Sequence, residues 1–185
     1  NKKLILKYNN EWVLLYIGGL GPHRGLETTL RSVPHVKNHI ENFKLLIVGA
    51  KDFEKDAIIK LANHLKITPC VEVINWVPFS EIFSFIKLSS VCIVPHDDYE
   101  HTQTTIPHKL FQYMIMGKPV LVSDCRPLKR VVDDTKSGLV FCANDPRDLA
   151  KKIIQLNHNK EELKKMSVNG IEAANGKYSW KIEKI

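Results

Sequence analysis

Short apolar runs alternate with longer amphipathic segments along this chain. Each run is rich in Val, Ile or Leu, and the six runs lie at residues 12–18, 43–49, 71–76, 91–95, 119–124 and 138–143. Continuous apolar runs of this length are typical of strands buried on both faces of a parallel sheet. Apolar residues recur at helical spacing in the segments between the runs, at residues 25–40, 54–67, 79–89, 107–117 and 126–137.

After the sixth run the pattern changes to one helix followed by another, at residues 146–157 and 161–174. Asp145 before Pro146 is typical of a capped helix start with proline at the first helical position. Residues 178–185 are expected to add one or two further helical turns. Alternating strands and helices predict an α/β fold, a doubly wound parallel sheet of about six strands with helices on both faces. No internal linker interrupts the pattern, so we predict one domain over residues 1–185.

Composition fits a soluble domain with a sizeable core. The chain has 185 residues, of which 44% are hydrophobic and 25% charged. No apolar run reaches the roughly 18 residues that a membrane span needs. The chain begins at Asn1 rather than at Met, and we expect it to be cut from a longer protein.

The formal net charge of +7 favours anionic partners. A phosphorylated ligand and an anionic membrane surface, which would allow peripheral membrane association, both fit this charge. Nucleic acid does not fit, because most lysines lie among acids at helical spacing, as in EELKK at residues 161–165, and no basic block is interleaved with aromatics.

The four cysteines are far apart, and no pair has the spacing of metal ligands. Cys92 and Cys142 stand inside apolar runs, where a free cysteine behaves as a small hydrophobe. We therefore expect buried free thiols and a cytoplasmic protein.

A glycine-rich turn, GGLGPHRG at residues 18–25, follows the first apolar run. Glycines let a phosphate approach the backbone amides, and a helix that starts behind them adds its N-terminal dipole. Arg24 can donate two hydrogen bonds to a phosphate. One alternative is a tight turn with a surface arginine. Another is an NAD-binding domain, from whose fingerprint the turn departs because Arg24 stands where a third glycine or alanine belongs.

A second candidate site begins after the fourth run, with a polar loop at residues 96–105 and Pro107 at a helix start. The first amides of this helix, those of His108 and Lys109, point out of its N-terminus, where an anion binds well. Gln112 follows one turn later on the same face and can hydrogen-bond hydroxyls of a sugar or ribose. The alternative for Lys109 and Gln112 is an exposed polar face.

Two histidines and three acids between His96 and His101 also fit a metal site. We interpret this segment as a solvated, flexible loop and expect no metal, since polar loops beside phosphate sites are common without one.

Taken together, GGLGPHRG, KLLIVG, NWVPFSEIFSFI and PHKLFQYMIMGKPVLVSD resemble the C-terminal domain of retaining glycosyltransferases of the GT-B fold, the group 1 or family 4 enzymes. The resemblance covers residues 12–185, and its most specific part is PHKLFQYMIMGKPV, similar to the family's Pro-Asn-Lys-Leu-Phe-Glu-Tyr-Met form. It implies a Rossmann-like domain, the C-terminal half of a GT-B fold. Residues 178–185 resemble the helix that packs near the junction of the two domains.

The same resemblance implies that the chain binds a nucleoside-diphosphate sugar as donor substrate and uses no other cofactor. The acceptor, a hydroxyl compound such as a glycan or lipid, would be held by an N-terminal domain that this chain lacks, so the chain is not expected to turn over alone. The cysteines favour a cytoplasmic location, and the positive charge allows attachment at the inner face of the membrane. The alternative is a noncatalytic or degenerate Rossmann-like module that binds a nucleotide.

By the resemblance, Arg24 contacts the diphosphate, Trp76 and Val77 receive the base, and Thr104 and Gln112 stand where the family has two glutamates, toward the donor sugar and the ribose. No catalytic acid, base or nucleophile is assigned, and Arg24 and Lys109 are expected to give electrostatic support. The full set of expected binding residues is Gly18, Gly19, Arg24, Gly25, Trp76, Val77, Thr104, Thr105, His108, Lys109, Leu110 and Gln112.

The chain departs from the family's pattern at this site. Gly19 stands where an arginine is frequent, His108 replaces asparagine, and neither glutamate is kept. Gln112 keeps acceptor capacity but loses the charge, which should weaken a hydrogen bond to ribose. A carboxylate from Glu100, on a shifted loop, is one conceivable replacement.

Overall fold

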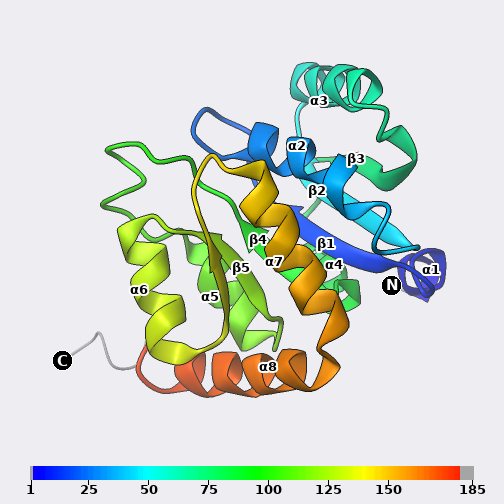
Figure 1. Ribbon diagram of the computed structural model, residues 1–185. Helices are drawn as coiled ribbons and strands as arrows, with labels where there is room; N and C mark the ends of the chain where they lie inside the picture. Colours follow the sequence, from blue (N-terminus) through cyan, green and yellow to red (C-terminus); the bar gives the residue numbers. More distant parts are fainter. Residues whose placement is uncertain (1, 180–185) are drawn as a thin grey trace.

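The computed structural model describes residues 2–179 of the chain, and its centre is a six-stranded parallel sheet. The strands are β1 (Trp12–Ile17), β2 (Phe43–Ala50), β3 (Val71–Asn75), β4 (Val91–Val94), β5 (Val120–Ser123) and β6 (Gly138–Phe141). They lie in the order β3-β2-β1-β4-β5-β6, and every neighbouring pair is parallel. The predicted doubly wound sheet is confirmed (Figure 1).

Helices follow the strands in the predicted alternation. They are α1 (Lys2–Lys7), α2 (Leu26–Val36), α3 (Asp52–His64), α4 (Phe79–Leu88), α5 (His108–Ile115), α6 (Arg126–Thr135), α7 (Pro146–His158) and α8 (Lys160–Asn175), with a 3₁₀ turn at Thr68–Cys70. Helix α1 was not predicted. The helical turns expected at residues 178–185 lie almost wholly outside the described residues.

The four central strands are buried on both faces, as their unbroken apolar runs predict, whereas the edge strands β3 and β6 are only partly buried. Along β1, Leu14 and Tyr16 point into one core, while Val13, Leu15 and Ile17 point into the other. Helices α2, α3 and α7 complete the first core, and α4, α5 and α6 complete the second. Each fully buried aliphatic side chain contributes about 1.5–3 kcal/mol to stability, so the double core fixes the sheet edge on which the site is built.

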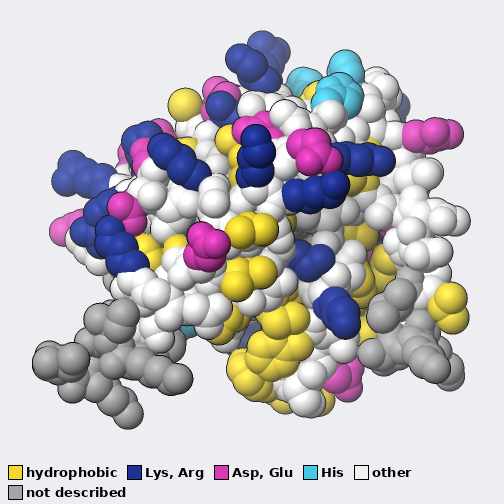
Figure 2. Space-filling model, turned by 90° about the horizontal axis from the view of Figure 1, so that it is seen from below, with side chains coloured by type: hydrophobic (Ala, Val, Ile, Leu, Met, Phe, Trp, Pro, Cys, Tyr) yellow, Lys and Arg dark blue, Asp and Glu magenta, His cyan; other side chains and the backbone are white. Residues whose placement is uncertain are grey.

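Helix α8 runs along the lower end of the molecule (Figure 1) and joins the two cores. It places Met166 in the first core and Ala174 in the second. On the face that carries α8, Lys and Arg side chains are interspersed with Asp and Glu (Figure 2). Lys164 pairs with Glu161 at 2.8 Å, and Lys177 pairs with Asp134 at 2.8 Å. Part of the positive charge is therefore neutralised locally.

The strand order reverses direction between β1 and β4. From β1 the chain proceeds outward to β2 and β3, then returns to the centre and proceeds the other way through β4, β5 and β6. The loops after β1 and β4 therefore lead away to opposite sides and leave a crevice between them. The pairing at this boundary is short: β1 and β4 match at Leu14 with Val91 and at Leu15 with Cys92.

Helix α7 begins as predicted. The Asp145 carboxylate accepts hydrogen bonds from the amides of Arg147 and Asp148, at 2.8 and 3.1 Å, and Pro146 takes the first helical position.

The expectation for the cysteines holds only in part. All four are free, and Cys92 is buried, but Cys142 is exposed. Cys142 follows the end of β6, the edge strand of the sheet, so no neighbouring strand covers it. Over residues 2–179, no helix is both long and apolar enough to cross a membrane.

Candidate functional site

The site begins at the loop of residues 18–25, which joins β1 to α2. Gly25 precedes α2 in a left-handed conformation, with φ 67°, and a Cβ there would stand 1.4 Å from the carbonyl oxygen of Pro95. Only glycine therefore lets the first turn of α2 lie directly against the end of β4. This close approach brings the loops after β1 and β4 together at one edge of the sheet, as Figure 1 shows.

The loop of residues 96–105, which follows β4, is held by its own hydrogen bonds. The buried Thr102 hydroxyl donates to the carbonyl oxygen of Asp97 at 2.6 Å and accepts from the amide of Tyr99 at 3.1 Å. The Tyr99 ring in turn stacks on His23 of the other loop, with ring centroids 3.7 Å apart. The Asp97 amide donates to the His23 carbonyl at 3.1 Å. These contacts bury His96 and Thr102, whereas residues 98–101 and Thr104 are exposed, so the outer part of the loop is solvated as expected.

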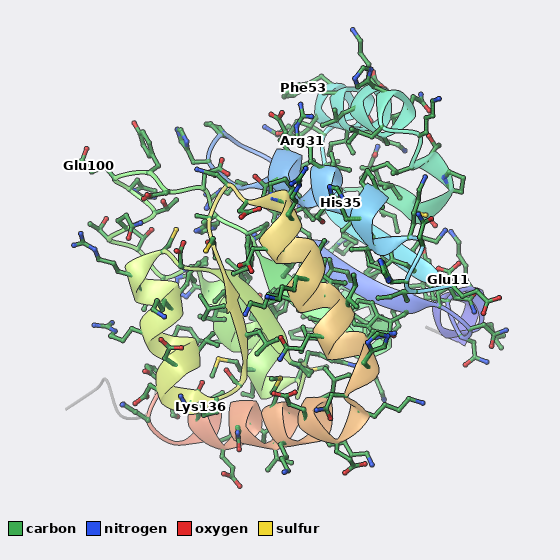
Figure 3. The ribbon with its side chains drawn as sticks, viewed as in Figure 1. Glu11, Arg31, His35, Phe53, Glu100 and Lys136 are labelled. Carbon is green, nitrogen blue, oxygen red and sulfur yellow. The ribbon has the colours of Figure 1, made fainter. Side chains whose placement is uncertain are left out.

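The acids of this loop do not gather into a metal site. Across residues 2–179, no three His, Cys, Asp or Glu side chains lie close enough together to share a metal ion. Glu100 is exposed at the outer end of the loop (Figure 3), so its carboxylate is far out on the loop rather than inside the crevice.

Helix α5 brings Lys109 under the glycine-rich loop. Its Tyr113 hydroxyl accepts a hydrogen bond from the amide of Ile17 at 3.1 Å, which ties α5 to the end of β1. Lys109 stands one turn before Tyr113, and its ammonium lies 4.2 Å from the centroid of the Tyr16 ring. The same ammonium is 2.8 Å from the point where a Cβ on Gly18 would stand. Lys109 therefore lies beneath the loop and not on an exposed polar face.

A hollow of about 390 Å³ opens between the glycine-rich loop and the start of α5. The residues that line it are Gly18, Gly19, Gly21, Arg24, His96, His101, Thr105, Ile106, Pro107, His108 and Lys109. Six of these were expected from the sequence. His96, His101 and Ile106 were not among the expected ligands. The position of His96 just after β4 was a signal, because residues at the carboxyl end of a central strand face the crevice. For His101 and Ile106, farther along the loop, the sequence offers no such signal.

The hollow is basic, and none of its lining residues is acidic. Burial, and then the charge of Arg24, lower the pKa of Lys109 to about 7. Burial, followed by the charges of Lys109, Arg24 and His101, lowers the pKa of His96 to about 4, so this ring is neutral. The Arg24 guanidinium lies 3.2 Å from His96, Nη1 to Nε2. Below about pH 7, Arg24 and Lys109 are thus two cations in one hollow with no carboxylate among its lining residues, an arrangement suited to an anion with two charged groups.

The other expected residues lie around this hollow or away from it. Gln112 lines a second hollow of about 210 Å³, which it shares with His108. Thr104 lines a third, of about 290 Å³, beside Arg126 at the start of α6. Trp76 is 74% exposed after the end of β3, and the neighbouring Val77 is half-buried. Gly25 is buried behind the hollow.

Leu110 is the one expected ligand whose side chain the fold removes from the site. It is fully buried in the core between α5 and the sheet. A contact through this side chain is therefore not available, and a contact through the Leu110 backbone stays a prediction.

Comparison with known proteins identifies related sequences and folds. The model of the family described as glycosyl transferases group 1 matches residues 1–173. An uncharacterized glycosyltransferase of Methanocaldococcus jannaschii is 27% identical over 180 residues, which are 97% of this chain and 48% of that protein. The chain therefore spans about half the length of the curated relative it matches.

Solved structures show the same fold at lower identity. Sucrose-phosphate synthase from Thermosynechococcus elongatus superposes with a TM-score of 0.84 and 20% identity, over 98% of this chain and 46% of that one. The HepE protein of Anabaena, solved in complex with UDP-glucose, superposes with a TM-score of 0.81 and 14% identity, over 94% and 47% of the two chains.

Proposed function

Because the chain belongs to the group 1 glycosyl transferases, we propose that it is the donor-binding domain of a glycosyltransferase and binds a nucleoside-diphosphate sugar. The observation that carries this proposal is the pair of unneutralised cations, Arg24 and Lys109, in one hollow at the crevice between β1 and β4. A diphosphate carries two adjacent anionic groups and matches such a pair. The Anabaena neighbour was solved with UDP-glucose, so a UDP-sugar is the first donor to test.

The diphosphate would lie between the glycine-rich loop and the N-terminus of α5. Arg24 would donate from the loop and Lys109 from the helix, and the amides at the start of α5 would add their dipole. Gln112, next along the helix face from His108, would face the ribose. Neighbouring strands are about 4.8 Å apart, so the end of β3 lies about 10 Å from β1, within reach for a base that meets Trp76 and Val77.

The proposed reaction transfers the sugar to an acceptor hydroxyl. The bond between the sugar's anomeric carbon and the diphosphate oxygen breaks, and the diphosphate leaves with the electron pair. The acceptor oxygen bonds to the anomeric carbon and gives its proton to the leaving diphosphate. Negative charge grows on the leaving diphosphate, and preorganised cations and amides around it lower the barrier. Arg24 and Lys109 are the groups of this chain that would stabilise that charge.

The acceptor would be held by a second domain. The 185-residue chain contains one Rossmann-like domain and spans about half of its relative's length. We therefore propose that residues 1–185 form a single donor-binding domain that works with an acceptor-binding domain. The acceptor would be a glycan, a lipid or another hydroxyl compound, and the proposed location is the cytoplasmic face of the membrane.

Calorimetric titration of the 185-residue chain with UDP, UMP, GDP, ADP and NAD tests the donor-binding role. One nucleoside diphosphate should bind more tightly than its monophosphate, because the second phosphate adds charge-assisted hydrogen bonds of about 1.5–3 kcal/mol each. Equal affinity for the diphosphate and monophosphate of every base would contradict the proposal. Selective binding of NAD would instead identify a dinucleotide-binding domain.

The substitution Arg24→Ala should weaken diphosphate binding by about 1–3 kcal/mol. Arg31→Ala is the matched control, since Arg31 lies on α2 outside the hollow (Figure 3) and pairs with Glu27 at 2.8 Å. Arg31→Ala should leave the dissociation constant unchanged. A loss of equal size in both variants would show that the effect is a general loss of positive charge.

A further inference from the structure

The structure places a buried histidine directly behind the basic hollow. Of the eight histidines, all within residues 2–179, His96 is the one with a buried side chain, 1% exposed. It lies at the end of β4, where the crevice begins, and it lines the hollow together with Arg24 and Lys109. Nothing proposed above requires this residue.

The contact between Arg24 and His96 fixes where the histidine carries its proton. A guanidinium can only donate hydrogen bonds, so a contact of 3.2 Å from Nη1 requires Nε2 of His96 to accept. Nε2 must then be unprotonated, and the single ring proton lies on Nδ1. Nδ1 is buried and has no hydrogen-bond partner among residues 2–179. The other neutral tautomer would direct one N–H group at another.

A neutral hydrogen-bond acceptor can hold an arginine in place without neutralising its charge. A carboxylate at this place would hold Arg24 but would also neutralise its charge. The imidazole holds the guanidinium and leaves its full charge for an anion in the hollow. The charged groups that face His96 are Lys109 from α5, Arg24 from the β1 loop and His101 from its own loop, and together with burial they keep the ring neutral at physiological pH.

We propose that His96 is a positioning residue for diphosphate recognition: as the neutral tautomer with its proton on Nδ1, it accepts a hydrogen bond from Arg24 and holds the guanidinium toward the hollow. The diphosphate part of this inference rests on the proposed function. The histidine–arginine contact itself does not, so the two can fail separately.

Nuclear magnetic resonance of the ring nitrogens tests the contact without any ligand. In the 185-residue chain, His96 should be neutral, with an unprotonated Nε2, from pH 5 to 8. Arg24→Ala should change the Nε2 shift and raise the pH at which His96 titrates, because a neighbouring positive charge is removed. A protonated Nε2, or a ring that is cationic at pH 6, would overturn the inference.

Two substitutions test the positioning role. In His96→Gln, the side-chain carbonyl oxygen can reach about the place of Nε2 and accept from Arg24, whereas His96→Phe fills the volume without an acceptor. His96→Phe should weaken UDP binding about tenfold, the effect of one lost oriented hydrogen bond, and His96→Gln should stay within about threefold of the unmodified chain. UMP binding should change less than UDP binding in both.

The Arg24→Ala background separates positioning from structural support. In that background, His96→Phe should weaken UDP binding by less than about a further twofold, since the arginine that His96 positions is gone. An equal loss with and without Arg24, or unchanged UDP affinity in His96→Phe, would refute the positioning role. If His96→Phe does not fold, the resonance measurements still test the contact between Arg24 and His96, and His96→Gln still tests whether another acceptor supports UDP binding. A chain that binds no UDP but shows the expected tautomer would disprove the proposed donor and leave the contact standing.

Discussion

At the scale of single residues, the charged form of Lys109 has opposite effects on the stability of the fold and on the proposed binding of a diphosphate. Burial lowers its pKa from 10.5 to about 7, so the unfolded chain holds more protons at this group than the folded chain between pH 7 and 10.5. The free energy of unfolding therefore rises with pH across that window, and the full penalty for burying the ammonium applies below pH 7. The proposed attraction of a diphosphate needs the same ammonium in its charged form.

We predict that Lys109→Met has opposite effects on the two properties. At pH 6.5 the melting temperature should rise by a few degrees, since about 1 kcal/mol corresponds to roughly 2–4 °C in a chain of this size. UDP affinity should fall, as measured by calorimetry. Lys118→Met is the matched control: Lys118 is also a half-buried lysine, but it donates to the carbonyl oxygens of Lys87 and Ser89, both at 2.7 Å. Its loss should lower the melting temperature and spare UDP binding.

The affinity of the unmodified chain for UDP should also depend on pH. Above pH 7 the terminal phosphate is fully ionised, since its second pKa is about 6. Lys109 loses its proton as pH rises through about 7, so affinity should fall between pH 7 and 9, by at most about tenfold per pH unit. Binding in that range should take up a proton, which titrations in buffers of different ionisation enthalpy measure. If UDP affinity does not change between pH 7 and 9, or if it falls equally steeply in Lys109→Met, then Lys109 is not the group whose deprotonation weakens binding.

Gln112 is one of the positions at which the chain departs from the family's pattern. Gln112→Glu should tighten binding of nucleotides with intact ribose by roughly 1 kcal/mol, because a carboxylate is a stronger acceptor for ribose hydroxyls than an amide. The 2′,3′-dideoxy nucleotide is the control and should gain nothing. Equal tightening of both would mean that Gln112 does not face the ribose.

Sequence predicted which side chains carry the charge of the site but not how they are held. Arg24, Lys109 and the glycines were predicted because their types and their places after strands indicate anion binding. Their surroundings were not predicted, since the burial of His96 and the stacking of Tyr99 on His23 depend on contacts between loops more than 70 residues apart in sequence. The side chain of Leu110 is in the core, as its apolar character at helical spacing predicts, so a role at the site would fall to its backbone.

At the scale of elements, the start of α2 depends on one glycine. Gly25→Ala would force a Cβ against the Pro95 carbonyl in a left-handed conformation, so we predict a loss of at least about 2 kcal/mol in the free energy of unfolding. Gly21→Ala is the control in the same loop, because a Cβ there meets nothing within 4 Å. It should stay within about 0.5 kcal/mol of the unmodified chain. Urea unfolding of the two variants gives both values.

The strands were predictable because all are covered on at least one face by the core and read as unbroken apolar runs. The predicted runs end within one or two residues of the observed strands. Helix α1 was missed because it has only six residues, KKLILK, too few for a helical period to show. Cys142 was misjudged because an apolar run does not tell a central strand from an edge strand.

At the scale of the whole molecule, binding and transfer should separate. We predict that the 185-residue chain binds UDP but transfers no glucose from UDP-glucose to any acceptor, because one Rossmann-like domain leaves the donor open to water and holds no acceptor. Transfer should be measurable only when an acceptor-binding domain accompanies this chain. Turnover by the 185-residue chain with an added acceptor would show that the domain carries its own acceptor site.

The short pairing between β1 and β4 also bears on how the molecule opens. It joins a unit built on β1 to β3 with a unit built on β4 to β6, and the hydrogen bond from Val13 to Ser90 at this boundary spans 77 positions. Arg24 belongs to the first unit and Lys109 to the second, so a diphosphate held by both would fasten the units together. Amide hydrogen exchange along β1 and β4 should then slow as UDP is added, in proportion to 1 + [UDP]/Kd. The donor substrate would therefore stabilise the folded state of the domain that binds it.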